Sequence, residues 1–371
     1  MRKIILFLVF AFILVSCDAS QSGSSGSGSF LPSFGSSSKK TPEVNVYVGT
    51  SGLTAEFAKT APPPKVFEQS SFPILLRIRN IGAYSLNYPS SPLGILSIGR
   101  ERDYIPQLII EENNKITLRA NDNELAFGVD GKTQLNPQGD ELIISINART
   151  GKLDPQSENK QSTLTATLCY PYKTTLSTTI CIDPDVAGVR PGKKACTVKE
   201  LAFNGGQGAP IAIVKIEPQM IPEVGQSPGS KADVIKPQFL IFVENKGKGT
   251  PVDNRFYSES CSRRDAADVA YPWNVAYIRA YTTSETKEAK ENFGNQLICC
   301  PNKDGQCPET ATGDTAGFLR FKDKKDYIRC TFKKGILRNS DAYTSPLRIE
   351  IDYGYVQTIS TSFFIQKPLK Y

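Results

Sequence analysis

The chain has no histidine among its 371 residues, and it has only one tryptophan and two methionines. Without an imidazole group it lacks Ser-His-Asp and Cys-His nucleophiles, histidine metal ligands and a histidine-based pH switch. Only carboxylate pairs, lysine or tyrosine would remain for proton transfer. We therefore expect a protein that is not an enzyme and that needs no cofactor or metal ion.

Two further features are missing from the sequence. No Asn-x-Ser/Thr acceptor site for N-glycosylation occurs in it. The lysines and arginines behind the net charge of +7 are scattered, and no basic stripe alternates with aromatic residues. A nucleic-acid-binding protein usually carries such a stripe, so we expect no nucleic-acid partner.

The longest apolar run lies at the N-terminus, where Ile4–Val15 follows Arg2 and Lys3. It is shorter than the ~20 residues that a membrane-spanning helix needs, and it has the form of an export signal. The segment Leu14-Val15-Ser16-Cys17 resembles a lipobox. That resemblance implies that Cys17 becomes the lipid-bearing first residue of the mature chain. The alternative is an ordinary cleaved signal peptide in which Cys17 is incidental.

We thus predict a signal peptide over residues 1–16 and a lipid anchor at Cys17, on the extracytoplasmic face of the cell envelope. The membrane is then a partner through that lipid. Residues 17–42 follow as a linker, and Asp18–Lys40 consists almost entirely of Ser, Gly, Gln and Lys. Such a composition cannot bury enough apolar surface to become ordered, so we expect a flexible leash with a reach of roughly 25 Å.

The rest of the chain alternates short β-branched and aromatic runs with Gly, Pro, Asn and Ser breaks. This spacing is typical of antiparallel β-sandwiches. We predict an all-β fold with two tandem Ig-like β-sandwiches, over residues 43–190 and 191–371. The predicted strands are Val44–Val48, Phe72–Arg79, Leu108–Ile110, Leu142–Ala148, Leu164–Tyr172, Leu176–Ile182, Ile211–Ile216, Gln238–Glu244, Val275–Tyr281, Gln296–Cys299, Phe318–Phe321, Tyr327–Phe332, Leu347–Tyr355 and Thr358–Ile365.

The two halves also match each other in sequence. Leu164–Asp183 aligns without a gap on Leu347–Gln366, which predicts one β-hairpin used twice. Earlier in each half, a strand ends in Asn80-Ile81-Gly82 or Asn245-Lys246-Gly247. Asparagine and glycine tolerate the positive φ of a tight turn. The second copy carries an insertion after Gly247.

A strand that ends in Asn-x-Gly within an exported sandwich resembles the CARDB-type domains, which are cell-adhesion-related Ig-like modules of bacterial and archaeal surface proteins. Val48–Phe57, Pro63–Phe67 and Gly205–Ala212 make the layout similar to uncharacterised archaeal surface lipoproteins. The resemblance implies an Ig-like fold and a cell-surface location, and it implies very little about activity.

Nine cysteines become eight when Cys17 is set aside, and an even number in an exported chain indicates disulfide bonds. Cys181–Cys196 is slightly favoured over Cys169–Cys181, and closing its loop of ~15 residues contributes about 3 kcal/mol. The disulfide candidates are Cys169, Cys181, Cys196, Cys261, Cys299, Cys300, Cys307 and Cys330.

Five of these cysteines lie between Gly247 and Leu347 of the second copy, and the other three, Cys169, Cys181 and Cys196, are counted with the first copy. Either one bond joins the halves, or each half keeps a free thiol. Cys299 and Cys300 are adjacent, so they point to opposite faces of a strand and need different partners. We expect one of them to reach Cys330 and the other to bond Cys307 or Cys261. The spacing does not suit a zinc site.

Three polar or glycine-rich clusters are candidate ligand sites. Gly205–Pro210 precedes a strand and not a helix, so we predict an interdomain hinge in place of a phosphate cradle. Asn121-Asp122-Asn123-Glu124 and Asp183-Pro184-Asp185 are rich in oxygen, but neither has the spacing of a calcium loop. The favoured interpretation of both is a turn in which the Asn and Asp side chains form hydrogen bonds with the nearby backbone.

The densest aromatic cluster consists of Tyr271, Trp273, Tyr277 and Tyr281. Tyr277 and Tyr281 share a face in a regular strand. Packing in the core is favoured, and the alternative is an exposed strip that binds a protein or glycan partner. Thr282–Asn292 is the predicted helix, because Thr282 and Glu285 form a capping box.

Together these features predict a lipid-anchored cell-envelope protein that acts as a non-catalytic structural or adhesive binding module. The alternative is an accessory lipoprotein of an envelope secretion or pilus-assembly machine that uses β-edge pairing.

Overall fold

The computed structural model describes residues 45–87, 90–119, 123–223, 234–262, 273–282, 295–301, 317–332 and 335–368. The predicted signal peptide, Cys17 and the linker lie outside these residues. So does the predicted helix, apart from Thr282, which ends a strand. Val44–Tyr371 form one compact unit by their contacts.

Antiparallel strands dominate this unit, so the prediction of an all-β sandwich fold is confirmed. The first half contains β1 (Leu53–Phe57), β2 (Lys65–Phe67), β3 (Ser71–Asn80), β4 (Gly94–Gly99), β5 (Gln107–Ile110), β6 (Ile116–Leu118), β7 (Glu124–Phe127), β8 (Glu141–Arg149) and β9 (Asn159–Ile182). The second half contains β10 (Leu201–Ala202), β11 (Ile211–Glu223), β12 (Val234–Asn245), β13 (Thr250–Val252), α1 (Tyr257–Ser262), β14 (Val275–Thr282), β15 (Asn295–Gln296), β16 (Ile298–Pro301), β17 (Gly317–Arg320), β18 (Lys325–Thr331), β19 (Ile336–Leu337) and β20 (Tyr343–Gln366).

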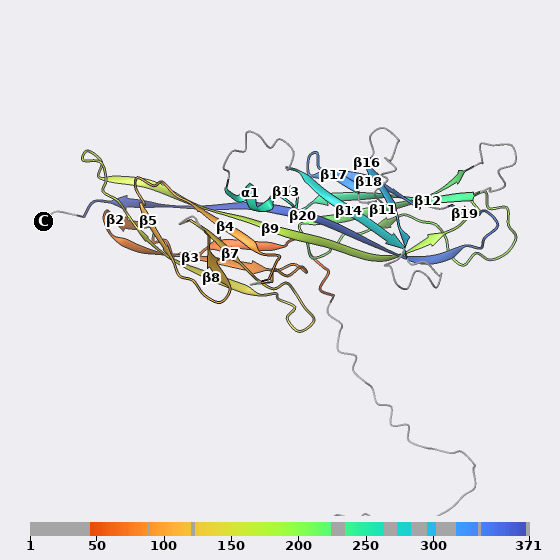
Figure 1. Ribbon diagram of the computed structural model, residues 1–371, viewed down its shortest axis with the longest axis horizontal. Helices are drawn as coiled ribbons and strands as arrows, with labels where there is room; N and C mark the ends of the chain where they lie inside the picture. The colour runs from red at the N-terminus through yellow and green to blue at the C-terminus, as the bar shows by residue number, and fades with distance from the viewer. Residues whose placement is uncertain are drawn as a thin grey trace, which may run out of the picture. The chain divides into compact units, whose positions relative to one another are not determined.

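The described strands form three sheets (Figure 1). One has the order β1-β3-β8-β5, and another the order β10-β11-β12-β18-β16 with β19 beside β12. The largest has the order β15-β14-β20-β9-β4-β7-β6, with β2 and β13 beside β20 and β17 beside β14. The first sheet packs on one half of the largest, where the rings of Phe72 and Phe363 are 5.1 Å apart. The second packs on the other half, where Thr174 Oγ1 donates to the carbonyl of Ile211 at 2.7 Å.

β9 and β20 join these two sandwiches. Each strand is 24 residues long, and the two pair antiparallel from Asn159–Gln366 to Ile182–Tyr343. At ~3.4 Å per residue the pair extends over ~80 Å. The prediction of a repeated hairpin in Leu164–Asp183 and Leu347–Gln366 is therefore wrong. Neither strand contains a residue with the positive φ that a two-residue hairpin turn needs, so each continues straight through.

Each long strand serves both sandwiches. Residues 355–366 of β20 lie in the first sandwich, and residues 172–182 of β9 lie in the second. Buried apolar side chains of both halves belong to one continuous core. The predicted ranges 43–190 and 191–371 thus share a sheet and a core. We call the level at which Pro171 pairs with Gly354 the waist.

Four tyrosines fill the core at the waist. Tyr170 pairs with Tyr355 in the ladder, Tyr172 pairs with Tyr353, and all four side chains are buried. Neighbouring rings lie 5.7 to 6.2 Å apart, which is the range of favourable aromatic contacts. In the sequence repeat Tyr170 matches Tyr353 and Tyr172 matches Tyr355, so a local twofold axis passes through the waist.

The repeated Asn-x-Gly segments bind two of these tyrosines. Tyr355 donates to Asn245 Oδ1 at 3.0 Å and accepts from the backbone N–H of Gly249 at 2.9 Å. A Cβ added at Gly247 would collide with the Tyr355 hydroxyl. Neither Asn nor Gly of these segments has positive φ, contrary to the sequence-based expectation. Glycine is needed here because the tyrosine hydroxyl occupies the place of a side chain.

Burial has a consequence for alkaline stability. Desolvation raises the pKa of Tyr355 from its usual 10.0 to about 12. The fold therefore favours the neutral phenol, so its stabilisation is complete below pH 10 and is lost as the pH rises through about 12.

We predict that unfolding free energy falls over this window, and that Tyr355→Phe makes the fall shallower. At neutral pH the same substitution should cost about 1–3 kcal/mol, because buried polar partners lose their hydrogen bonds. Denaturant titrations over a pH series measure both effects. Tyr47→Phe is the control, since Tyr47 is half exposed. An unchanged pH dependence in Tyr355→Phe would contradict this account.

Candidate functional site

Three disulfide bonds join described cysteines, and one of them links the two halves. Cys181 bonds Cys196, which is the pairing that the sequence slightly favours. Cys299 bonds Cys330 at directly paired positions of β16 and β18. Cys300 is also disulfide-bonded, and Cys307 lies outside the described residues. The odd counts allow either a bond between the halves or a free thiol in each, and the structure has the bond, between Cys169 and Cys261.

The Cys169–Cys261 bond holds α1 on the outer face of the shared sheet. Cys261 packs in a small buried cluster with Ile95 and Cys169, next to Val356. Tyr257 of α1 lies so close to Gly354 that a Cβ there would be 2.6 Å from the Cβ of Tyr257. The sequence does not indicate this helix, because six residues are too few to show a helical period.

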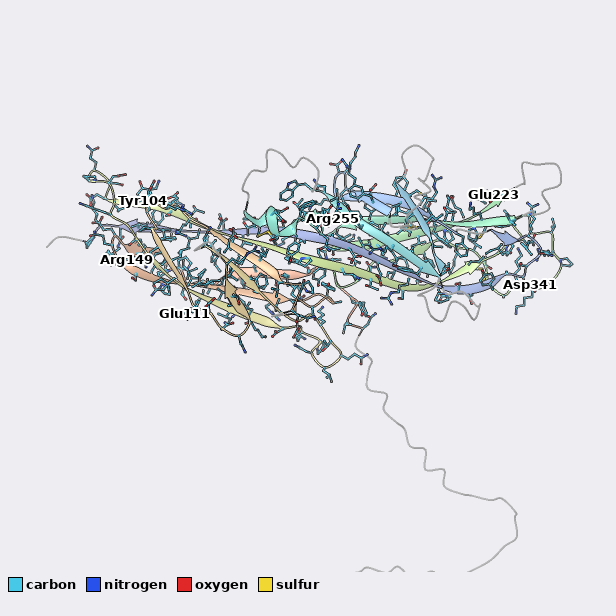
Figure 2. All side chains as sticks on the ribbon, viewed as in Figure 1. Tyr104, Glu111, Arg149, Glu223, Arg255 and Asp341 are labelled. Atoms are coloured by element: carbon cyan, nitrogen blue, oxygen red, sulfur yellow. A yellow bond between two sulfur atoms is a disulfide. The ribbon has the colours of Figure 1, made fainter. Side chains whose placement is uncertain are left out.

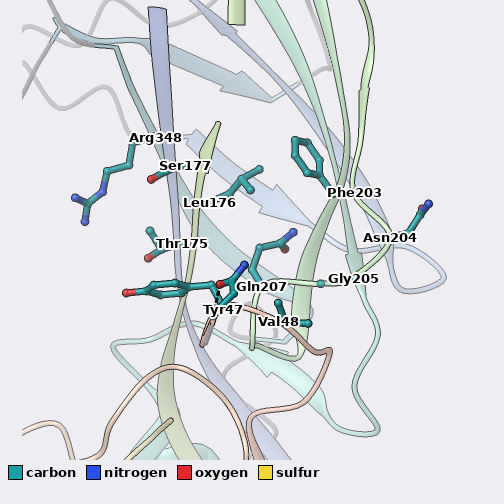
Figure 3. Close-up of a pocket in the computed structure, with 12 residues that line it drawn as sticks. Tyr47, Val48, Thr175, Leu176, Ser177, Phe203, Asn204, Gly205, Gln207 and Arg348 are labelled. Carbon is teal, nitrogen blue, oxygen red and sulfur yellow. Dashed lines mark hydrogen bonds between the residues drawn. The ribbon is translucent and has the colours of Figure 1, made fainter. Parts of the chain in front are cut away.

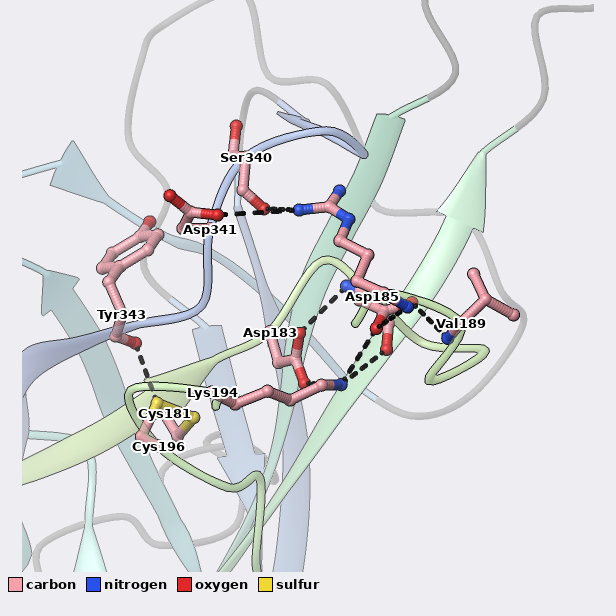
Figure 4. A network of polar contacts seen from close by, with 10 residues as sticks. Cys181, Asp183, Asp185, Val189, Lys194, Cys196, Ser340, Asp341 and Tyr343 are labelled. Atoms are coloured by element: carbon pink, nitrogen blue, oxygen red, sulfur yellow. Dashed lines mark hydrogen bonds and ion pairs between the residues drawn. A yellow bond between two sulfur atoms is a disulfide. The ribbon is translucent and has the colours of Figure 1, made fainter. Parts of the chain in front are cut away.

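Asp183 and Asp185 form a closed ion-pair network and not an open cation site. Lys194 Nζ lies 2.6 Å from Asp183 Oδ2 and 3.2 Å from Asp185 Oδ2, between the two carboxylates (Figure 4). Asp185 also accepts from the backbone N–H groups of Val189 and Arg190. Desolvation acts to raise the pKa of Asp185, but these donors and Lys194 hold it below its usual value.

The predicted turn is present in this segment. The side chain of Asp183 accepts a hydrogen bond through Oδ1 from the backbone N–H of Asp185 at 3.0 Å. In the other oxygen-rich segment, Asn121 and Asp122 lie outside the described residues. Asn123 Nδ2 donates to the carbonyl of Ile98 at 3.1 Å.

The predicted aromatic strip is only partly in the core. Tyr277 and Tyr281 share the outer face of β14, as expected, and both are half-buried. The Tyr277 hydroxyl donates to Asp253 Oδ2 at 3.0 Å and accepts from Arg255, which lies near the middle of the unit in Figure 2. Trp273 bridges to Val252 at the end of β13. Tyr271 lies outside the described residues.

A groove opens at the waist on the side of β9 that faces away from β20 (Figure 3). We call it the waist groove, and its volume is about 580 Å³. Figure 3 shows Leu176 of β9 pointing toward Phe203, while the side chains of Thr175 and Ser177 lie on the other side of the strand. Its lining comprises Asn45, Tyr47, Val48, Thr175, Leu176, Ser177, Phe203, Asn204, Gly205, Gly206, Gln207 and Arg348.

Backbone bonds fix one wall of this groove. Gly49 donates to the carbonyl of Gly205 and accepts from Gly208, both at 2.8 Å, so the segment before β1 pairs with the glycine-rich loop. Ala83 also donates to Gly208, and Lys246 donates to Pro210. The loop is thus bonded to both sandwiches, and the prediction of a hinge over Gly205–Pro210 is wrong. The strand after it does begin at Ile211.

No helix within the described residues has the length and apolar character to cross a membrane. No protein-family model and no curated protein matches the sequence.

Three solved structures show distant similarity to the chain. The C-terminal domain of the Streptococcus agalactiae AgI/II polypeptide BspA is 8% identical, with a TM-score of 0.19 over 85% of this chain and 100% of that one. The C-terminal domain of the Streptococcus pyogenes antigen I/II-family protein AspA is 7% identical, with a TM-score of 0.20 over 86% and 100%. The BSP domain of a biofilm-associated protein is 10% identical, with a TM-score of 0.18 over 88% and 53%. Similarity at this level carries no argument about function.

Two neighbouring glycines test the wall of the waist groove. Gly206 has φ +68°, and a Cβ there would lie 2.8 Å from the carbonyl carbon of Gly49, whereas a Cβ at Gly205 meets only Val48 at 4.0 Å. We predict that Gly206→Ala costs about 1–2 kcal/mol and frees the segment around Gly49, while Gly205→Ala does neither. Hydrogen exchange of the Gly49 and Gly208 amides measures this. Equal protection in the two variants would contradict the prediction.

Proposed function

We propose that the chain is a lipid-anchored protein of the cell envelope, and that its body is a structural and adhesive binding module without catalysis. The observation that carries this proposal is the sheet that both sandwiches share through β9 and β20. Because the same two strands belong to both sandwiches, the surfaces of the two halves sit on one continuous scaffold. Such a scaffold suits a protein that presents binding surfaces outside the cell.

The outer face around β14 supports a binding role. Half-buried Tyr277 lies edge-on to Phe318 at 5.3 Å, and Arg279 pairs with Asp352 at 2.8 Å on the same face. Aromatic and arginine side chains are enriched where proteins bind partners. We propose a protein or a glycan as the partner of this face.

The first described residues support an attachment at the waist. Asn45 and Tyr47 line the waist groove, and Gly49 is bonded to the loop beside it. A linker over residues 17–42 would therefore join the body at its middle. Both ends of the unit would then stay available to partners.

The anchor is tested on the chain purified from its native membrane. We predict loss of residues 1–16 and a lipid mass on the peptide that starts at Cys17, by mass spectrometry. Cys17→Ser should leave the membrane fraction, with the Cys181–Cys196 bond still formed. Recovery of the intact N-terminus with an unmodified Cys17 and reduced thiols from the cell interior would overturn the anchor and the location together.

The adhesive role has its own readout. A strain without the protein should adhere less to other cells or to surfaces, and the wild-type chain should restore adhesion where Cys17→Ser does not. Truncation is unsuitable for this purpose, because removing either half takes one strand of the β9–β20 pair from the other. Unchanged adhesion in the deletion strain would refute the adhesive role.

A further inference from the structure

The second half of β9 has one open edge. β20 pairs with β9 over its whole length, but on the other side β4 pairs only with Thr165–Cys169. Within the described part of the chain, no strand pairs with residues 171–182 on that side. An edge of this kind presents backbone groups that another chain can bind.

The pairing pattern shows which residues face the open edge. Ile98 donates to the carbonyl of Asn123 across β4 and β7, so Ile98 turns its backbone toward β7. The alternate residues of β4 therefore bond β9, where they pair with Thr165, Thr167 and Cys169. Because β9 continues without a register shift, Lys173, Thr175, Ser177 and Thr179 point their N–H and C=O groups the same way, into the open edge.

The corresponding edge of β20 has a strand partner at each of its two ends. By the local twofold axis, residues 354–366 of β20 correspond to residues 171–183 of the first half. There β13 pairs with Gly354–Val356, and β2 pairs with Phe364–Gln366. β9 has neither partner among the described residues, so the two halves differ at this edge.

The waist groove runs along this open edge. Thr175, Leu176 and Ser177 of the edge line it, and Leu176 points toward Phe203 across it. The opposite wall contains Gly205, where a Cβ would meet nothing closer than 4.0 Å, so a main chain has room to approach. The segment at Gly49 already binds next to this groove through backbone hydrogen bonds alone.

We propose that the waist groove binds an extended segment of a partner protein, which adds as a strand to the open edge of β9. Backbone hydrogen bonds to Thr175, Ser177 and Thr179 hold the segment. An apolar side chain on its inner face contacts Leu176 and Phe203, while the outward side chains stay polar. The proposal deepens the proposed function by naming the partner of a second surface, and it rests on that function only for the partner lying outside the cell.

The test selects phage-displayed random dodecapeptides against the full chain in detergent. Enriched peptides should alternate apolar and polar residues. Ser177→Pro removes one N–H at the open edge while leaving the bonds to β20, as Pro171 does at an equivalent position of the same strand. Ser177→Ala is the matched control, because it keeps the N–H. We expect about tenfold weaker peptide binding to Ser177→Pro and unchanged binding to Ser177→Ala.

A modified peptide makes the test independent of how the variant folds. Every second amide of a bound strand faces β9. N-methylation of those amides in an enriched peptide should abolish its binding, whereas N-methylation of the other amides should leave binding unchanged.

Three outcomes would overturn the proposal. The first is the absence of any enriched peptide. The second is peptide binding that Ser177→Ala weakens as much as Ser177→Pro, since this would assign the binding to the Ser177 side chain and not to the backbone edge. The third is a dimer of the chain that Ser177→Pro converts to a monomer, since this would assign the edge to a second copy. The lipid on Cys17 and the adhesion of cells are measured separately, so failure here leaves those results unaffected.

Discussion

The pairing of β9 with β20 is the constraint on which the rest of the structure depends. Four tyrosines gather around the Pro171–Gly354 pair, and the hydroxyls of Tyr172 and Tyr355 reach the Asn-x-Gly segments of the two halves. A ladder of 24 residues on each strand is far longer than the five or six residues of an ordinary strand. Because both strands run on into the other half, each half contributes buried residues to the core of the other. Neither sandwich is therefore complete alone.

Differences between the halves are built upon this shared framework. The insertion after Gly247 places α1 on the outer face, where the Cys169–Cys261 bond holds it across the two halves. β13 and β2 pair with the two ends of the outer edge of β20, whereas the matching edge of β9 has no such partner among the described residues and borders the waist groove. The binding surface that we infer is thus a place where the local twofold symmetry fails.

The sequence predicted the fold class and the repeat, because alternation of apolar residues and turn chemistry are local properties. It did not predict that β9 and β20 each run through both sandwiches, although the sequence contains a signal for this. From Leu164 to Ile182 the inward residues of β9 stay in one phase, with no glycine or asparagine to make a turn at Lys173. The Cys169–Cys261 bond and the waist groove could not be foreseen, since both depend on residues that only the packing of the two halves brings together.

Native-state hydrogen exchange in increasing denaturant tests the central claim most directly. If the shared pair holds both sandwiches, the amides that bond across it, which belong to even-numbered residues of β9 and odd-numbered residues of β20, should exchange through one opening with the same free energy and the same denaturant slope. The buried strands β3 and β12, one from each half, should open with them. Exchange of one sandwich at a clearly lower free energy, while the other stays protected along the whole of β9 or β20, would contradict this account.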